Sequence, residues 1–274
     1  MKRHSSTIGL VLIFLFGLIL LLYPSFSDWW NQFHQSRAVV SYAETVATID
    51  NPAYERMYTE AVEYNERLKE SEIHWILTPE EMDEYNNTLC VTESGIMSYI
   101  EIPAINVMLP VYHGTEGTIL QVAIGHLAGT SLPVGGESTH CVLSGHRGLP
   151  SARLFTDLDK LVKGDIFFIR TLDEVLTYEV DQIRIVEPTD LSDIVIVEGQ
   201  DYCTLVTCTP YGINTHRLLV RGHRVETVTN ATVRVVADAL QVGTAIVALF
   251  IAIPILLVLM IIVLLTSGRS KKRA

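Results

Sequence analysis

Three residues that could carry out acyl transfer stand at the ends of β-like runs in this 274-residue chain. Cys208 ends the run Thr204-Leu-Val-Thr-Cys208, Arg217 begins the run 217–224, and His146 follows the run 139–144. A thiolate is a nucleophile, an imidazole can protonate a leaving amine, and a guanidinium can stabilise a developing oxyanion. Because strand ends can meet at one edge of a sheet, these side chains are candidates for a single catalytic site.

The pattern around Cys208 predicts a strand that ends at the cysteine. Residues alternate between two faces over 202–208, and Thr209-Pro-Tyr-Gly212 then predicts a turn. If the strands on either side of that turn are adjacent, Arg217 lies beside the thiol. Taken alone, Cys208 also fits a buried strand position, where cysteine packs as a small hydrophobe. His146 alone also fits an ordinary loop.

Longer runs around these residues resemble one protein family. Leu143-Ser-Gly-His-Arg-Gly-Leu-Pro-Ser-Ala-Arg-Leu-Phe-Thr-Asp-Leu-Asp159 and Cys208-Thr-Pro-Tyr-Gly-Ile-Asn-Thr-His-Arg-Leu-Leu-Val-Arg-Gly-His-Arg224 resemble segments of sortases, the cysteine transpeptidases of Gram-positive cell surfaces. Within the family they look like class C, the pilin-polymerising branch. The resemblance covers residues 54–226.

The resemblance implies a reaction and a role for each residue. Cys208 would attack the carbonyl between Thr and Gly in the Leu-Pro-x-Thr-Gly-like sorting signal of a pilin precursor, forming a thioacyl intermediate. His146 would protonate the departing glycine amine, and Arg217 would hold the substrate and the oxyanion. An acceptor lysine of the next pilin would resolve the thioester into an isopeptide bond. This chemistry needs no cofactor and no metal.

One segment departs from the class C pattern. Class C sortases commonly cover the active site with a lid loop in which Asp-Pro precedes an aromatic residue. The corresponding segment here, Ile73-His74-Trp75, has the aromatic residue without Asp-Pro. We hypothesise that Trp75 inserts toward Cys208 and gates access, with His74 near the thiol. The alternative is an amphipathic linker that Trp75 anchors.

Three other functions fit the same residues. A sortase could anchor surface proteins to peptidoglycan, using an amino group of the cell-wall peptide as acceptor. A membrane receptor or pilus-assembly scaffold could use the fold without catalysis, and Cys208 would then be inert. A cysteine protease would let water resolve the thioester, but no carboxylate or asparagine partner for His146 is evident from the motif positions.

The remaining histidines and cysteines do not indicate a metal site. The nine histidines and four cysteines contain no Cys-x-x-Cys and no His-x-x-x-His spacing. His126 matches a histidine that sortases often carry near the site without a catalytic role. His140, His216 and His223 are expected to pack in strands or loops.

The cysteine spacing leaves two disulfides open. Cys203 and Cys208 lie five apart on one predicted strand, so their side chains point to opposite faces and do not pair. Pairing of Cys141 with Cys90 or with Cys203 remains possible in an oxidising compartment.

Two apolar stretches predict a membrane protein. Ile8–Tyr23 is uncharged and follows Lys2 and Arg3, so it fits an uncleaved anchor or the core of a signal peptide. Thr244–Leu265 has 22 uncharged residues before the basic tail 269–273, which predicts a transmembrane helix with a cytoplasmic C-terminus. The catalytic segment would then lie outside the cell, with membrane lipid as a partner of the helices.

The charge is divided unevenly between these tails and the segment that they enclose. Six of the 20 lysines and arginines lie in the tails, which leaves 14 basic and 31 acidic residues, a net charge of −17, between them. So acidic a segment argues against nucleic acid as a partner. A solvated acidic surface is the simpler interpretation.

Helical spacing precedes the strands. Tyr54, Met57, Ala61, Tyr64 and Leu68 recur at steps of three and four residues, which predicts an amphipathic helix with Pro52 in its first turn. Thr78-Pro-Glu-Glu81 predicts the start of a second helix, because threonine followed three residues later by glutamate is a capping box.

From Met97 onward, strands predominate. They are expected at about 97–102, 107–112, 119–126, 139–146, 165–171, 175–185, 202–208 and 217–224, with one short helix at Leu154–Leu161. Eight strands with few helices favour a closed barrel, and the family resemblance implies the eight-stranded sortase barrel.

We therefore expect a mainly β protein with this barrel, N-terminal helices and flanking transmembrane helices. The expected parts are a hydrophobic signal or anchor segment (1–34), a helical region with the lid (35–90), the catalytic barrel (91–227), and a linker, transmembrane helix and basic cytoplasmic tail (228–274).

Overall fold

The computed structural model describes residues 2–70, 75, 77–92 and 94–227. The chain divides into two units, and the unit Phe26–Val228 contains all the strands described below. The predicted transmembrane helix Thr244–Leu265 and the basic tail lie outside the described residues.

Helix α1 (Lys2–Val46) extends across the expected boundary between residues 34 and 35. Within Ile13–Val46 it has a stretch that is long and apolar enough to cross a membrane, by length and composition alone. Its last turns pack on the strands instead, because Val39, Tyr42 and Val46 belong to the hydrophobic core. Burial of this apolar face explains why the helix continues beyond residue 34.

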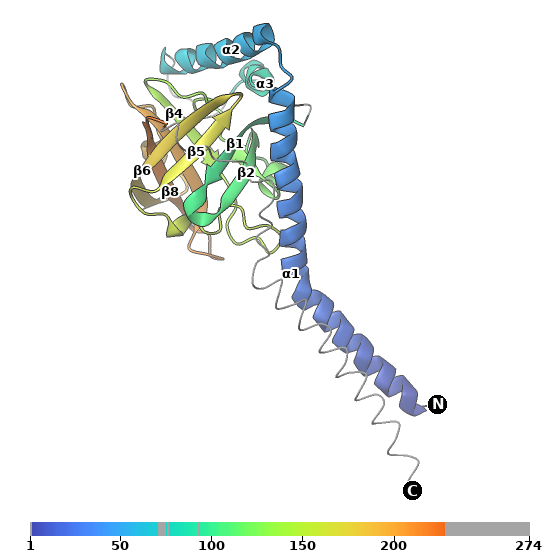
Figure 1. Cartoon of the computed structure of the whole chain (residues 1–274). Helices are drawn as coiled ribbons and strands as arrows, with labels where there is room; N and C mark the ends of the chain where they lie inside the picture. The colour runs from blue at the N-terminus through green and yellow to red at the C-terminus, as the bar shows by residue number, and fades with distance from the viewer. Residues whose placement is uncertain (1, 71–74, 76, 93, 228–274) are drawn as a thin grey trace. The chain divides into compact units, whose positions relative to one another are not determined.

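Eight strands close into a barrel in the order β1-β2-β3-β4-β7-β8-β6-β5, which confirms the predicted fold (Figure 1). The strands are β1 (Ile96–Ile102), β2 (Val107–His113), β3 (Ile124–His126), β4 (Thr139–Ser144), β5 (Ile166–Thr171), β6 (Glu174–Val186), β7 (Asp201–Thr209) and β8 (His216–Val225). The pairs β2–β3 and β4–β7 are parallel, and the other neighbours are antiparallel.

Two predicted elements were too long. The strand predicted at 119–126 is limited to β3, because Gly117–Leu120 forms the short helix α4 and the Leu120 N–H bonds to the Glu116 carbonyl at 3.0 Å. The helix predicted at Leu154–Leu161 is reduced to the 3-10 turn η2 (Leu158–Lys160). The φ angle of +37° at Leu154 interrupts a regular helix there. Two further 3-10 turns are η1 (Pro103–Ile105) and η3 (Ser192–Ile194).

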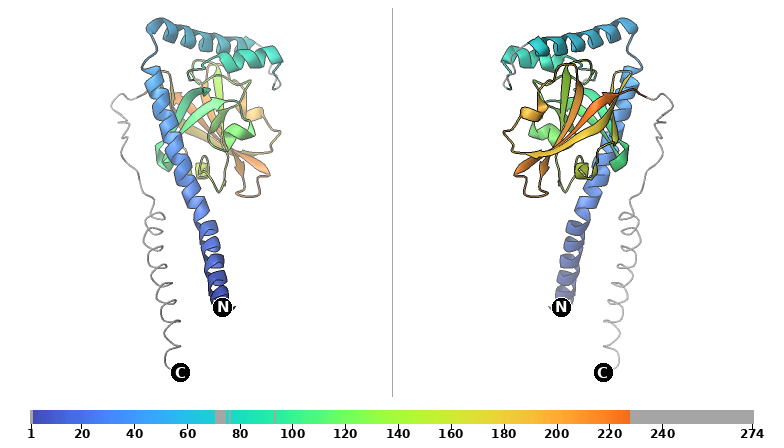
Figure 2. Two further views of the ribbon diagram at one scale, coloured as in Figure 1. Left: turned by 90° about the vertical axis from the view of Figure 1, so that its right-hand side faces the viewer. Right: turned by 90° about the vertical axis from the view of Figure 1, so that its left-hand side faces the viewer.

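Both helices predicted ahead of the barrel are present at one of its ends (Figure 2). Helix α2 (Asn51–Glu70) buries Ala61 and Tyr64 of the predicted stripe. Helix α3 (Pro79–Asn87) begins with the predicted capping box: the Glu81 N–H bonds to Thr78 Oγ1 at 3.2 Å, and the Thr78 N–H bonds to Glu81 Oε2 at 2.7 Å.

The cysteines occupy different environments, and all four are free. Cys141 and Cys203 are buried register partners on β4 and β7. Burial raises the pKa of the Cys203 thiol. Cys90 is exposed, whereas Cys141 is buried. Cys208 is partly exposed whereas Cys203 is fully buried, as expected for opposite faces of one strand.

Replacing Tyr42 with phenylalanine tests how α1 is held to the barrel. The buried Tyr42 hydroxyl donates to the Met97 carbonyl at 3.0 Å and accepts from the Leu172 N–H at 2.8 Å. Tyr42→Phe leaves both backbone groups unpaired, so the free energy of unfolding should fall by about 1–3 kcal/mol. Chemical denaturation of the full chain in detergent measures this loss. Tyr211→Phe, which removes an exposed hydroxyl, is the control; equal midpoints for the two variants would refute the prediction.

Candidate active site

Three neighbouring strands carry the candidate residues toward one edge of the barrel. Strand β4 pairs in parallel with β7, from Thr139 opposite Asp201 to Ser144 opposite Val206. Strand β8 pairs antiparallel with the other side of β7. The end of β4, the end of β7 and the start of β8 therefore meet at the same edge.

Cys208 and Arg217 are direct cross-strand partners on β7 and β8. Side chains opposite each other in an antiparallel pair have Cβ atoms about 4.5–5.5 Å apart and share a face. Both residues are partly exposed. Arg217 Nη1 donates to the carbonyls of Asn214 (3.4 Å) and His216 (3.2 Å), so the guanidinium lies by the turn that joins the two strands.

His146 lies two residues beyond the last β4–β7 pair. Contacts between the strands continue past that pair, because the Gly145 N–H bonds to the Val206 carbonyl at 3.0 Å and Thr207 Oγ1 donates to the Gly145 carbonyl at 2.7 Å. These bonds direct His146, which is partly exposed, toward the end of β7 where Cys208 stands. The structure thus brings all three predicted residues to one edge.

Gly145 allows the chain to approach the barrel closely just before His146. A Cβ at this position would lie 2.6 Å from Ile124 Cδ1 and 2.7 Å from Phe155 Cδ2. The Phe155 N–H also bonds to the His146 carbonyl at 3.1 Å. Packing and this hydrogen bond together fix the backbone that carries the imidazole.

Arg147 joins the loop of His146 to the loop that follows Cys208. Its side chain is 9% exposed and forms an ion pair with Asp159. Nη1 lies 3.4 Å from Thr209 Oγ1, and the guanidinium carbon lies 5.8 Å from the centroid of the Tyr211 ring. Sequence reasoning assigned Arg147 no role. Its position between His146 and Gly148, in a run with glycine on both sides, was the available signal.

His140 holds the loop that leads into β7. Nδ1 lies 2.8 Å from the Val195 carbonyl and Nε2 lies 2.7 Å from Thr204 Oγ1. A carbonyl can only accept, so Nδ1 carries the proton and Nε2 accepts from the Thr204 hydroxyl. Burial lowers the pKa of His140 to about 4, with a smaller opposing effect of the Val195 hydrogen bond. The imidazole is therefore neutral and structural.

Trp75 packs on the outer face of these strands. It is partly buried against a small apolar cluster formed by Val142, Val186, Ile194 and Leu219. Val206 contacts the same cluster and stands two residues before Cys208, on the same face of β7. Trp75 thus shares a face with the thiol, and its action as a lid stays a prediction. His74 lies outside the described residues.

Two further histidines, His126 and His216, have structural partners. His126 is buried, with Nδ1 2.9 Å from the Tyr85 hydroxyl and Nε2 2.9 Å from the Ser131 carbonyl. His216 Nε2 lies 3.2 Å from a carboxylate oxygen of Glu187. Within the described part of the chain, no group of three or more His, Cys, Asp and Glu side chains is placed to hold a metal ion.

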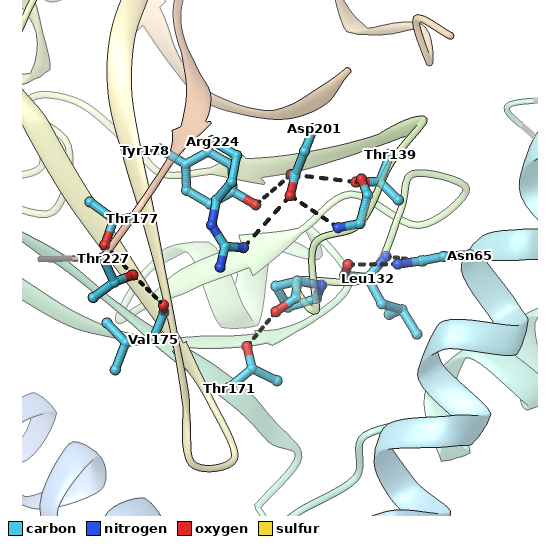
Figure 3. Close-up of polar contacts among 12 residues, drawn as sticks. Asn65, Leu132, Thr139, Thr171, Val175, Thr177, Tyr178, Asp201, Arg224 and Thr227 are labelled. Carbon is cyan, nitrogen blue, oxygen red and sulfur yellow. Dashed lines mark hydrogen bonds and ion pairs between the residues drawn. The ribbon is translucent and has the colours of Figure 1, made fainter. Parts of the chain in front are cut away.

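A second polar cluster lies at the opposite end of β7 (Figure 3). Asp201 accepts from the Tyr178 hydroxyl at 2.9 Å and from the Gly136 N–H at 3.0 Å, and lies 3.6 Å from Arg224 Nη1. Asp201 and Arg224 border a cavity of about 730 Å³ that α2 also lines. Cys208 stands seven residues along the strand, about 23 Å at 3.3 Å per residue, so this cavity does not serve the thiol.

Comparisons with known proteins identify the family. A family profile described as Sortase domain matches residues 100–225. The crystal structure of sortase C1 from Streptococcus agalactiae is 55% identical over 70% of this chain and 99% of that chain, with a TM-score of 0.68. The chain belongs to the sortase family.

Further relatives define the branch. Sortase C of Streptococcus pneumoniae is 49% identical over 70% of this chain and 97% of its own, with a TM-score of 0.63, and its structure is described in terms of pilin substrate specificity. Sortase C of Clostridium perfringens was solved with the C-terminal cell wall sorting motif; it is 41% identical over 70% of this chain and 99% of its own (TM-score 0.62). The alignment with Sortase D of Bacillus subtilis is 33% identical over 48% of this chain and spans 64% of that protein.

The barrel is therefore the sortase fold, and the protein is a sortase-type cysteine transpeptidase with class C structural neighbours, as the sequence predicted.

The protonation of His140 should make stability depend on pH. Its folded pKa of about 4 lies below the ordinary value of 6.5, so between these pH values the unfolded chain takes up a proton that the folded protein does not. This contribution is fully present above pH 6.5 and is lost as the pH falls toward 4, by about 3 kcal/mol in total. Denaturation midpoints across this window should fall less steeply for His140→Gln than for wild type. The control is His34→Gln, which replaces an exposed histidine and should keep the wild-type slope. Equal slopes for His140→Gln and wild type would contradict the prediction.

Proposed function

We propose that this sortase joins pilin subunits: it cleaves a Leu-Pro-x-Thr-Gly-like sorting signal between Thr and Gly and transfers the new acyl group to a lysine. The observation that carries the proposal is the pairing of Cys208 with Arg217 across β7 and β8. The loop of His146 is hydrogen-bonded to β7, the strand that ends near Cys208. The pilin-related and sorting-motif-bound neighbours support the choice of substrate.

The first half-reaction forms a thioester. The thiolate of Cys208 attacks the threonine carbonyl carbon, and the carbon–nitrogen bond to glycine breaks. His146 gives its proton to the departing glycine amine, which leaves as a neutral group. Arg217 would stabilise the negative charge on the carbonyl oxygen, because its guanidinium is always charged and Arg217 is the cross-strand partner of Cys208.

In the second half-reaction Cys208 becomes the leaving group and His146 becomes the base. The ε-amine of an acceptor lysine attacks the thioester carbon, the carbon–sulfur bond breaks, and Cys208 leaves as thiolate. His146 takes the proton that the lysine nitrogen loses. The product is an isopeptide bond between two pilins, and the enzyme returns to its starting state without a cofactor.

The acceptor distinguishes the proposal from its alternatives. An amino group of the cell-wall peptide would anchor the protein to peptidoglycan, and water would make the enzyme a protease. We place the barrel outside the cell, anchored by the apolar part of α1, where each of these acceptors is found. The net charge of −17 between the two basic tails suits attraction of lysine-bearing subunits.

Trapping of the acyl-enzyme tests the proposal directly. Full-length protein in detergent is mixed with a Leu-Pro-x-Thr-Gly peptide and a pilin acceptor domain, and mass spectrometry follows the adduct and the products. Wild type should form a thioester on Cys208 and then a lysine isopeptide, whereas Cys208→Ala should form neither. Arg217→Ala should lower kcat/KM about 10²–10³-fold through loss of oxyanion stabilisation.

Each other outcome selects an alternative. An adduct that only hydrolyses would favour the anchoring or protease function. An adduct that transfers to a cell-wall peptide but not to the pilin would favour anchoring. If neither wild type nor Trp75→Ala forms an adduct, the non-enzymatic scaffold is favoured.

The same chain allows a test of the lid. If Trp75 covers the approach to the thiol, Trp75→Ala should raise the rate at which a thiol reagent labels Cys208, because the apolar cluster beneath the indole is uncovered. Mass spectrometry of the labelled peptide separates Cys208 from exposed Cys90, whose labelling rate is the internal control. An unchanged rate at Cys208 would leave Trp75 as the anchor of a linker.

A further inference from the structure

Helix α1 displays aromatic side chains on a face that the barrel does not cover. Phe26, Trp29, Trp30 and Phe33, here called the aromatic stripe, are 60%, 40%, 50% and 44% exposed. Their rings contact one another, with centroids 5.8 Å apart for Phe26–Trp29 and 6.4 Å for Trp29–Phe33. The guanidinium carbon of Arg37 lies 5.4 Å from the centroid of the Phe33 ring and extends this face by one turn.

The opposite face of the same turns is bound to the barrel. Asn31 Nδ2 donates to the Ser151 carbonyl at 2.8 Å, and the Arg153 N–H donates to Asp28 Oδ1 at 3.0 Å. Gln35, one turn later, is buried and donates to the Val122 carbonyl at 2.7 Å. Because these residues fix the rotation of the helix about its axis, the aromatic stripe must point away from the strands.

The composition and position of the aromatic stripe fit a lipid surface. It begins three residues after Tyr23, where the uncharged stretch 8–23 of the same helix ends. Tryptophan is enriched at the membrane–water boundary, where its ring is partly apolar and its N–H can bond to headgroups or water. Trp29 lies only six residues after Tyr23 in the sequence, so chain connectivity keeps the indole rings near the end of the uncharged stretch, where the headgroup layer is expected.

We propose that the aromatic stripe docks in the headgroup layer of the bilayer and thereby holds the active-site end of the barrel at the membrane surface. The side chains that oppose it bind the 151–153 backbone, and Phe155 in the same loop bonds to His146. Docking therefore sets the height of the His146 loop above the lipid. This inference concerns lipid contact and stands independently of the proposed reaction.

The three tryptophans of the chain make a direct test possible. Trp75→Phe leaves Trp29 and Trp30 as the only indoles, and the full chain is placed in nanodiscs of phosphatidylcholine and phosphatidylglycerol. Lipids brominated near the headgroup should quench the indole emission more strongly than lipids brominated near the chain ends. Acrylamide in the water should quench it weakly.

A matched control reports a site that faces water. Trp29→Phe and Trp30→Phe are added to Trp75→Phe, and Val197→Trp places one indole just before the start of β7, at the end of the barrel opposite Cys208, where Val197 is 41% exposed. This control should respond to acrylamide and not to brominated lipid. The proposal is overturned if the aromatic stripe responds like the control. It is also overturned if the stripe is shielded from both quenchers, which would show that protein, from residues 244–265 or a second copy, covers it.

Discussion

Strands β4 and β7 run parallel although 62 positions separate each residue from its partner, and the site depends on this pairing. Parallel neighbours need a long crossover, which here contains β5 and β6. Closing so large a loop costs entropy, so the pairing must be supported by burial. Leu143 and Leu205, which are register partners, are both fully buried in the core.

The register of this pair fixes the chemistry as well as the fold. A slip of one residue would turn the side chains of β7 to the opposite face. Cys208 would then enter the core, where Cys203, five residues earlier on the same strand, is a buried thiol with a raised pKa. In the observed register Cys208 faces outward beside Arg217. The environment that the strand supplies, rather than the residue type, distinguishes Cys208, the proposed nucleophile, from the core cysteine.

The sequence predicted those features that depend on neighbouring residues. Alternation and turns located eight strands, and the capping box at Thr78 located the start of α3. It did not reveal α4, because the residues of Gly117–Leu120 can also extend a strand and only backbone bonding decides between them. Nor did it reveal the role of Arg147, whose partners Asp159 and Thr209 come from distant segments.

The loop of His146 is held from two sides by different elements. On one side, Arg147 attaches it to the residues that follow Cys208, through Thr209 and the Tyr211 ring. On the other side, its continuation at Ser151 is bound by Asn31 of α1. Because α1 is also bound to the core through Tyr42, a displacement of the helix must be transmitted to the loop or break these bonds. Helix α1, which contains the apolar stretch long enough to cross a membrane, therefore also supports the loop of His146.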